Sequence, residues 1–155
     1  MEDMLFNALN YGAIGSVLFF LILVIISRTK IFEAVRDEEG QFRKGIAPKG
    51  IFGLSLMLGF FVGIIWWSNA SFAQIVENPD FYLLWWNAFL TFMVIHIFDL
   101  VVIDLMLIVW WHPKFLNLPD TDYYTKVRPH VQGFIKGIPL GAVLSMVISL
   151  LYLAF

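Results

Sequence analysis

"FYLLWWNAFLTFMVIHIFDLVVIDLMLIVWW", residues 81–111, is the segment of the sequence that decides the fold. It is apolar almost throughout, and its WW pairs stand near its two ends. As a helix it would be roughly 46 Å long. Because the hydrocarbon layer of a bilayer is only about 30 Å thick, we expect this helix to tilt or to project beyond the hydrocarbon.

Three further segments have the same character: residues 11–27, 50–72 and 131–155. Each is close to the roughly 20 apolar residues that a membrane-crossing helix needs. The chain is 60% hydrophobic and only 14% charged, whereas a soluble domain carries about 25% charged residues. We therefore predict an all-α integral membrane protein. It is a four-transmembrane-helix bundle of two antiparallel hairpins, a single membrane domain over residues 1–155 that contacts the lipid bilayer.

The basic residues predict the orientation of this bundle. All 10 Lys and Arg residues would lie on one side of the membrane. They are Arg28, Lys30, Arg36, Arg43, Lys44 and Lys49 in the first inner loop (28–49), Lys114, Lys126 and Arg128 in the second (112–130), and Lys136 just inside the last span. Basic residues accumulate on the cytoplasmic side. We therefore expect a protein of the cytoplasmic or plasma membrane with both termini outside the cytoplasm.

Several classes of function have no support in the sequence. The chain has no cysteine, which removes disulfides, thiolate metal sites and thiol redox chemistry. It has no basic tail of the kind that binds nucleic acid. Phosphate-binding glycine loops, nucleophile elbows and zinc-protease motifs are also missing. These absences favour a protein that is not an enzyme.

Small residues recur at every fourth position in two of the predicted spans. They are Ser55, Gly59 and Gly63 in the second span, and Gly133, Gly137, Gly141, Ser145 and Ser149 in the fourth. In lipid, helices associate by close packing along such residues. We predict that these stripes are contact ridges. Either the second and fourth spans pack on each other, or one stripe forms the seam of a homo-oligomer or larger membrane complex.

Titratable side chains inside the predicted spans are few: His96, Asp99, Asp104 and Lys136. An ionised aspartate at the bilayer centre costs roughly 2.5–3.5 kcal/mol, so we expect each to have a partner. In an α-helix, residues three apart share a face, which predicts a His96–Asp99 pair. Asp104 would then point well away from Asp99. Asp104 and Lys136 would lie at a similar depth in the membrane, which predicts an ion pair between them.

Three functions are compatible with these groups. Aspartate and histidine relays are typical of pumps and transporters, which favours transport or proton and ion coupling. Alternatively, the groups only fix helix register in an accessory or scaffold subunit. The third possibility is a haem- or metal-binding protein, although the main interpretation predicts no cofactor. A metal would need His96 and Asp99 from two protomers, while His112 and His130 at the inner boundary are the weaker candidates for haem.

Overall fold

The computed structural model describes residues 1–29, 31, 35, 45, 48–116 and 122–155, and this part of the chain is helical without strands. Four helical segments are long and apolar enough to cross a membrane. They are α1 (Glu2–Ser27), α3 (Pro48–Ile75), α4 (Phe81–Phe98) continued by η1 (Asp99–Trp111), and α6 (Val127–Ala154). Two short elements, η2 (Lys114–Leu116) and α5 (Asp122–Thr125), precede α6. The predicted all-α class with four spans is confirmed, and it indicates a multi-pass membrane protein.

The first two spans extend beyond the apolar segments that predict them, whereas the third has the predicted bounds, Phe81–Trp111. The first begins at Glu2 rather than near residue 11, with Glu2 and Asp3 in its first turn, where negative charge is favourable. The third span begins at Phe81 because the Asp80 side chain accepts a hydrogen bond from the Leu83 N–H at 2.9 Å, which caps the helix. Hydropathy therefore marks the third span in full but misses the ends of α1 and α3.

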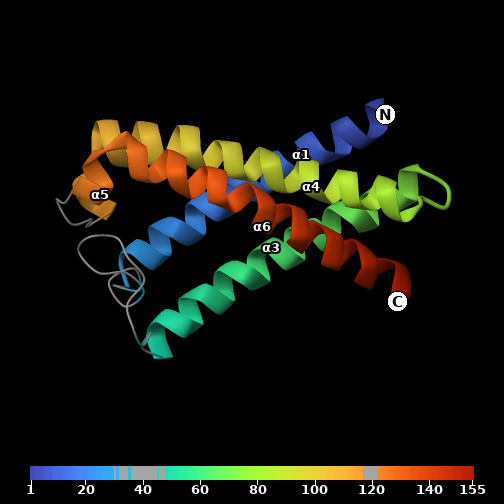
Figure 1. The fold of residues 1–155 in the computed structure, drawn as a ribbon, viewed down its shortest axis with the longest axis horizontal. Helices are drawn as coiled ribbons and strands as arrows, with labels where there is room; N and C mark the ends of the chain where they lie inside the picture. The colour runs from blue at the N-terminus through green and yellow to red at the C-terminus, as the bar shows by residue number, and fades with distance from the viewer. Residues whose placement is uncertain (30, 32–34, 36–44, 46–47, 117–121) are drawn as a thin grey trace.

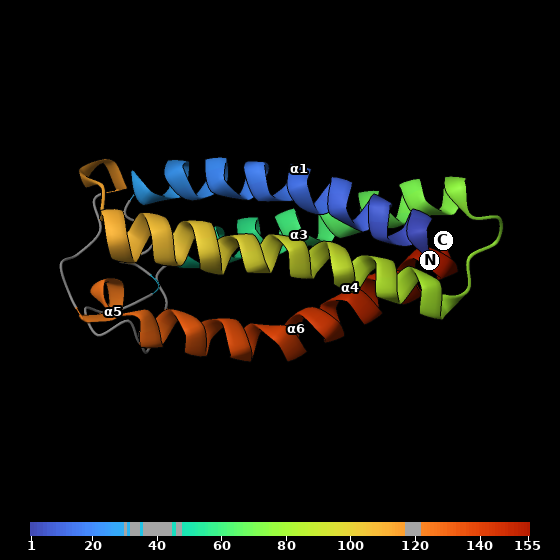
Figure 2. The same cartoon turned by 90° about the horizontal axis from the view of Figure 1, so that it is seen from above.

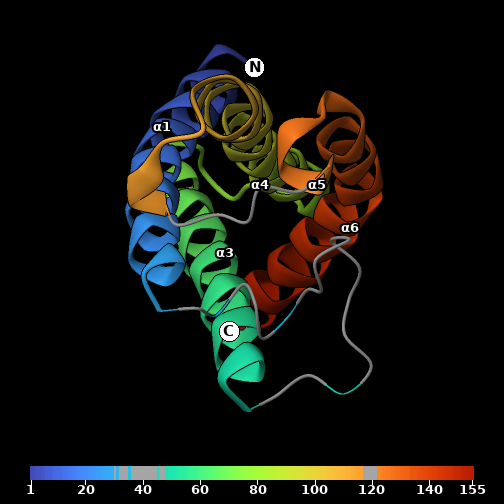
Figure 3. The ribbon, with the colours of Figure 1, turned by 90° about the vertical axis from the view of Figure 1, so that its left-hand side faces the viewer.

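The two ends of the bundle contain different segments of the chain. Figure 1 shows both termini at the same end as the segment that joins α3 to α4, with α5 at the other end. Figures 1 and 2 together show that α3 and α6 are close near the C-terminus and diverge toward the α5 end. Figure 3, seen from the α5 end, shows α1, α3, α4 and α6 around the long axis of the bundle.

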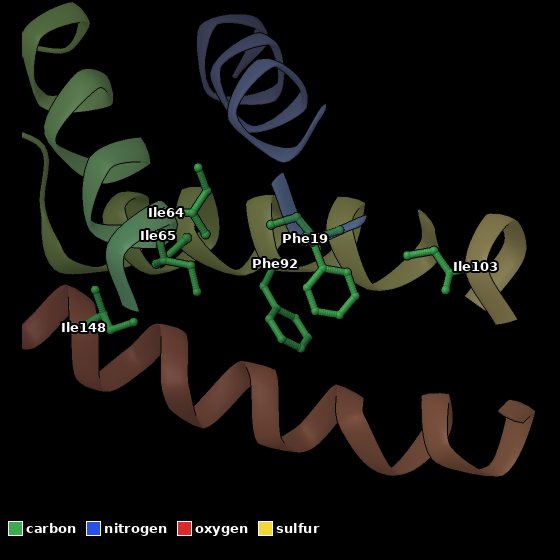
Figure 4. Close-up of a cluster of buried hydrophobic side chains, with 8 residues drawn as sticks. Phe19, Ile64, Ile65, Phe92, Ile103 and Ile148 are labelled. Carbon is green, nitrogen blue, oxygen red and sulfur yellow. The ribbon is translucent and has the colours of Figure 1, made fainter. Parts of the chain in front are cut away.

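The apolar core contains side chains from all four spans, as the close-up in Figure 4 shows. Its buried members are Phe19, Ile64, Ile65, Ala88, Phe92, Ile95, Ile103 and Ile148. Much of the remaining apolar side-chain area faces outward, as in the exposed rings of Phe6, Phe52 and Trp110. Lipid tails are as apolar as leucine, so the core is stabilised by close packing rather than by removal from water.

The small-residue stripe of α6 lies against α4. A Cβ atom added to Gly141 would overlap the ring of Phe92, and one added to Gly137 would overlap the ring of His96. This close approach of α6 to α4 therefore requires glycine at both positions. Gly133 differs, because an added Cβ would meet nothing within 4 Å.

The stripe of α3 contacts no other helix of the described chain. Ser55 is exposed, and a Cβ added to Gly59 or to Gly63 would meet nothing within 4 Å. The prediction that the stripes of the second and fourth spans pack on each other is therefore wrong. The cause is that the stripe lies on the outward face of α3, whose buried face is formed instead by residues such as Ile64, Ile65 and Ser68.

Candidate functional site

A buried hydrogen-bond network of uncharged side chains joins the four spans near the termini. Asn7 of α1 donates from Nδ2 to Asn87 Oδ1 of α4 at 2.9 Å and to the Ser68 carbonyl of α3 at 3.0 Å. Asn87 donates to Asn69 Oδ1 at 3.0 Å, and Asn69 donates to Ser149 Oγ of α6 at 3.1 Å. None of these side chains is more than 2% exposed.

This amide network is satisfied internally. The Ser68 hydroxyl lies 2.8 Å from the Thr91 hydroxyl, and Thr91 in turn donates to the Asn87 carbonyl at 2.8 Å. Fully paired polar groups fix the relative positions of helices and leave nothing to bind a ligand. The network therefore holds the four spans together at this end of the bundle.

The helix that carries the aspartates changes its hydrogen-bonding pattern at Asp99. From Asp99 to Trp111 it is a π-helix, and at its end the His112 N–H donates to the Leu107 carbonyl, five residues earlier, at 2.9 Å. In a π-helix, residues five apart lie on one face. Asp99 and Asp104 are five apart, so they share a face. The prediction that Asp104 points well away from Asp99 assumed α-helical geometry and is wrong.

Both aspartates line a cavity of about 320 Å³ that lies between α1, η1, α5 and α6. Its other titratable lining side chains are His96, His130, Tyr123 and Tyr124. Most of the remaining wall is apolar, with the rings of Phe19, Phe20 and Phe134 among it. Lys136 is not among the lining residues and is exposed on the surface of α6.

His96 binds to α6 rather than to its neighbour along the helix. Its Nε2 lies 3.0 Å from the carbonyl oxygen of Phe134, and the two rings stack with centroids 4.5 Å apart. Among the described residues no hydrogen bond joins His96 to Asp99, so the predicted pair is not formed. Same-face spacing made that pair possible, but close packing of α6 placed a backbone acceptor nearer to the imidazole.

Asp104 has His130 as its partner. Its Oδ1 lies 2.9 Å from Nδ1 of His130, and the two side chains are 22% and 4% exposed. The predicted Asp104–Lys136 ion pair is therefore replaced by an Asp104–His130 pair. The sequence placed His130 at the membrane boundary, whereas α6 begins at Val127 and already holds His130 in its first turn. Lysine, with its long stem, can keep its charge at a polar surface.

Two groups at the cavity have no polar partner. Asp99 makes no hydrogen bond or ion pair with any residue that the structure describes. The second ring nitrogen of His130, Nε2, is buried and has no hydrogen-bond partner among the described residues. A fully buried polar group without a partner costs about 1–3 kcal/mol, whereas Asp99 is only partly buried. Groups of this kind at a cavity are where a bound molecule or a proton would be stabilised most.

The metal and haem candidates were His96, Asp99, His112 and His130. Within the described ranges no three His, Cys, Asp or Glu side chains come close enough to hold one metal ion. His112 lies at the end of η1 with φ of 45°, and its Nδ1 is 3.1 Å from the Ile108 carbonyl. It is not among the lining residues, whereas His130 is.

Sequence reasoning identified part of this site. It selected His96, Asp99 and Asp104, which line the cavity, and Lys136, which does not. It missed the importance of Asn7 and Asn69, because one lies before the predicted first span and the other near the end of the second. No protein-family model, curated protein or solved structure matches the chain. The geometry of the cavity therefore carries the functional argument.

Proposed function

We propose that the chain is a small membrane transport protein, coupled to protons or ions, whose working site is the cavity at the α5 end. The observation that carries this proposal is the gathering of His96, Asp99, Asp104 and His130 around one cavity. Titratable groups inside a membrane are costly and mark substrate or proton pathways. Aspartate and histidine are also the usual groups of proton relays in pumps and transporters.

The roles of the cavity groups follow from their partners. Asp99 has no described partner and is the group that would take up and release a proton or cation. The Asp104–His130 pair holds α6 beside η1. His96 binds the Phe134 carbonyl five residues before Pro139, which lies inside α6. A proline weakens the helix at this point, so a change of charge at the cavity can be passed to α6.

The orientation follows from charge. Of the six basic residues that the structure describes, five belong to the helix ends and connections at the α5 end, and Lys136 lies about two turns inside α6: Arg28, Lys49, Lys114, Lys126, Arg128 and Lys136. By the positive-inside rule, the cavity lies in the cytoplasmic half of a cytoplasmic or plasma membrane. Both termini would then be outside the cytoplasm, and the spans would form two antiparallel hairpins.

The second candidate function is an accessory or scaffold subunit of a homo-oligomer or larger membrane complex. Two observations favour it. The amide network holds the four spans with uncharged groups alone, and the stripe of Ser55, Gly59 and Gly63 on α3 faces outward. An outward stripe of small residues suits contact with another helix.

Proton flux in reconstituted liposomes distinguishes the two functions. We expect wild-type protein to carry protons faster than protein-free liposomes under an imposed membrane potential, as measured with an entrapped pH-sensitive dye. Asp99→Asn should reduce this flux by at least about tenfold, because it removes the ionisable group without changing side-chain size.

Glu77→Gln is the matched control, because it removes an equal charge from an exposed site outside the cavity. It should leave the flux unchanged. Flux that equals the protein-free rate, or that survives Asp99→Asn, would contradict transport and favour the scaffold.

A further inference from the structure

The wall of the cavity has an unbalanced charge. Asp99 and Asp104 contribute two carboxyl groups, and no lysine or arginine is among the described residues that line the cavity. His130 is paired with Asp104 at 2.9 Å and not with Asp99. Asp99 has no counter-charge among the described residues. The cavity is therefore complementary to a positive charge and would reject an anion.

The remainder of the wall is apolar and aromatic. Phe19, Phe20 and Phe134 line the cavity beside the acidic groups. Phe134 is stacked on His96, and the Tyr123 ring lies against His130 with centroids 5.6 Å apart. Aromatic faces attract cations, and the attraction increases where water is excluded. A ligand here would meet apolar contacts on most sides and carboxylate on one.

This composition is unsuited to a bare metal cation. Hard cations such as Ca²⁺ take six to eight oxygen ligands. The lining provides few side-chain oxygens, chiefly those of Asp99, Asp104 and two tyrosines. An organic ammonium ion needs only one or two acceptors for its charged group, and it gains from apolar contact along its body.

We infer that this cavity binds a small monovalent organic cation, an ammonium group on an apolar body about the size of one aromatic ring. The ammonium group would lie at Asp99, and the apolar body would lie among the rings of α1 and α6. The volume of about 320 Å³ is at the lower end of the range for small-molecule sites. The inference rests on the proposed function and names the substrate class of the same site.

Equilibrium binding to the detergent-solubilised full chain tests this inference. Three probes of nearly equal size are compared by titration calorimetry: phenethylammonium, 2-phenylethanol and phenylacetate. We expect the cation to bind at least about tenfold more tightly than the neutral alcohol or the anion. The alcohol also reports partitioning into the micelle, and equal affinities for all three probes would overturn the inference.

Variants locate the bound cation. Asp99→Asn should weaken phenethylammonium binding by at least about tenfold, and Glu77→Gln should leave it unchanged. Unchanged binding to an Asp99→Asn variant that keeps wild-type circular dichroism would overturn the assignment. The wild-type probe comparison decides the matter even if that variant does not fold. Cation binding without proton flux would support this inference and contradict the proposed proton coupling, while proton flux without cation binding would do the reverse.

Discussion

Asn87 shows how a single buried amide holds this bundle together. It accepts from Asn7 and donates to both Ser68 and Asn69, so it connects α4 with α1 and α3. It is fully buried. Hydrogen bonds between membrane helices contribute about 0.6 kcal/mol on average, but an unpaired buried partner costs about 1–3 kcal/mol. The second effect dominates because removal of Asn87 leaves the buried Asn69 Oδ1 without its described donor, whereas Asn7 and Ser68 keep other hydrogen bonds.

We predict that Asn87→Ala lowers the free energy of unfolding by about 1–3 kcal/mol. The measurement is an unfolding titration in mixed micelles followed by circular dichroism. Asn10→Ala is the matched control, because Asn10 is on α1 but exposed, and it should change stability by less than about 0.5 kcal/mol. Equal effects of the two substitutions would show that the network does not stabilise the fold.

The partner of Asp104 can be tested in the same way. His130→Ala should destabilise the protein by about 1–2 kcal/mol, less than the 3–5 kcal/mol of a fully buried broken pair, because Asp104 is 22% exposed. Lys136→Met should change stability by less than about 0.5 kcal/mol, since Lys136 is exposed. Thermal unfolding in detergent compares the two variants. A larger loss for Lys136→Met would favour the Asp104–Lys136 pair that the sequence suggests.

At the scale of the element, the spans were predictable and their local geometry was not. A long apolar segment crosses a membrane as a helix, because every backbone group must be hydrogen-bonded within the segment. The same segment does not distinguish an α-helix from a π-helix. The change at Asp99 therefore had no signal in hydropathy, yet it decides that Asp99 and Asp104 share a face.

The spacing of small residues predicted helix contact only in part. Along α6, Gly137 and Gly141 pack closely against α4, whereas Gly133 and the stripe of α3 do not contact another described helix. Spacing does not say which helix they meet. On α1, an added Cβ at Gly12 would lie 2.5 Å from Val94, and one at Gly15 would lie 2.5 Å from Ile95. That contact was missed because α1 has no long stripe of glycine and serine.

Gly141→Ala should destabilise the protein by about 1–3 kcal/mol, the usual cost of overpacking, because the new methyl group would overlap the ring of Phe92. Gly133→Ala on the same helix should be neutral or stabilise by up to about 1 kcal/mol, since nothing lies within 4 Å of its Cβ. Denaturation midpoints of the two variants give the comparison. Similar shifts for both would contradict the close approach of α6 to α4.

At the scale of the whole molecule, the bundle has two unlike halves. Near the termini, uncharged side chains join the four spans: Asn7, Asn69, Asn87 and Ser149. Toward α5, Asp99 and Asp104 line a cavity instead. One half is held by paired uncharged groups, and the other has ionisable groups and space. With this division, a site that is reached from one side of the membrane can change its charge while the other half maintains the fold.

The central claim is that water and solutes reach this cavity from the cytoplasmic side. Because the chain has no native cysteine, reaction of single introduced cysteines with a charged, membrane-impermeant thiosulfonate tests it directly. Gly133 lines the cavity and has room for a side chain. Two control positions lie away from the cavity. Ser145 is fully buried, and Gly63 lies on the outward face of α3, where an added Cβ meets no described neighbour.

We predict that Gly133→Cys reacts rapidly, and only when the reagent is on the cytoplasmic face, while Ser145→Cys and Gly63→Cys remain unmodified. Reaction of Gly133→Cys from the opposite face would contradict the proposed orientation. If Gly133→Cys reacts no faster than Ser145→Cys from either face, water does not reach the cavity and the central claim is wrong.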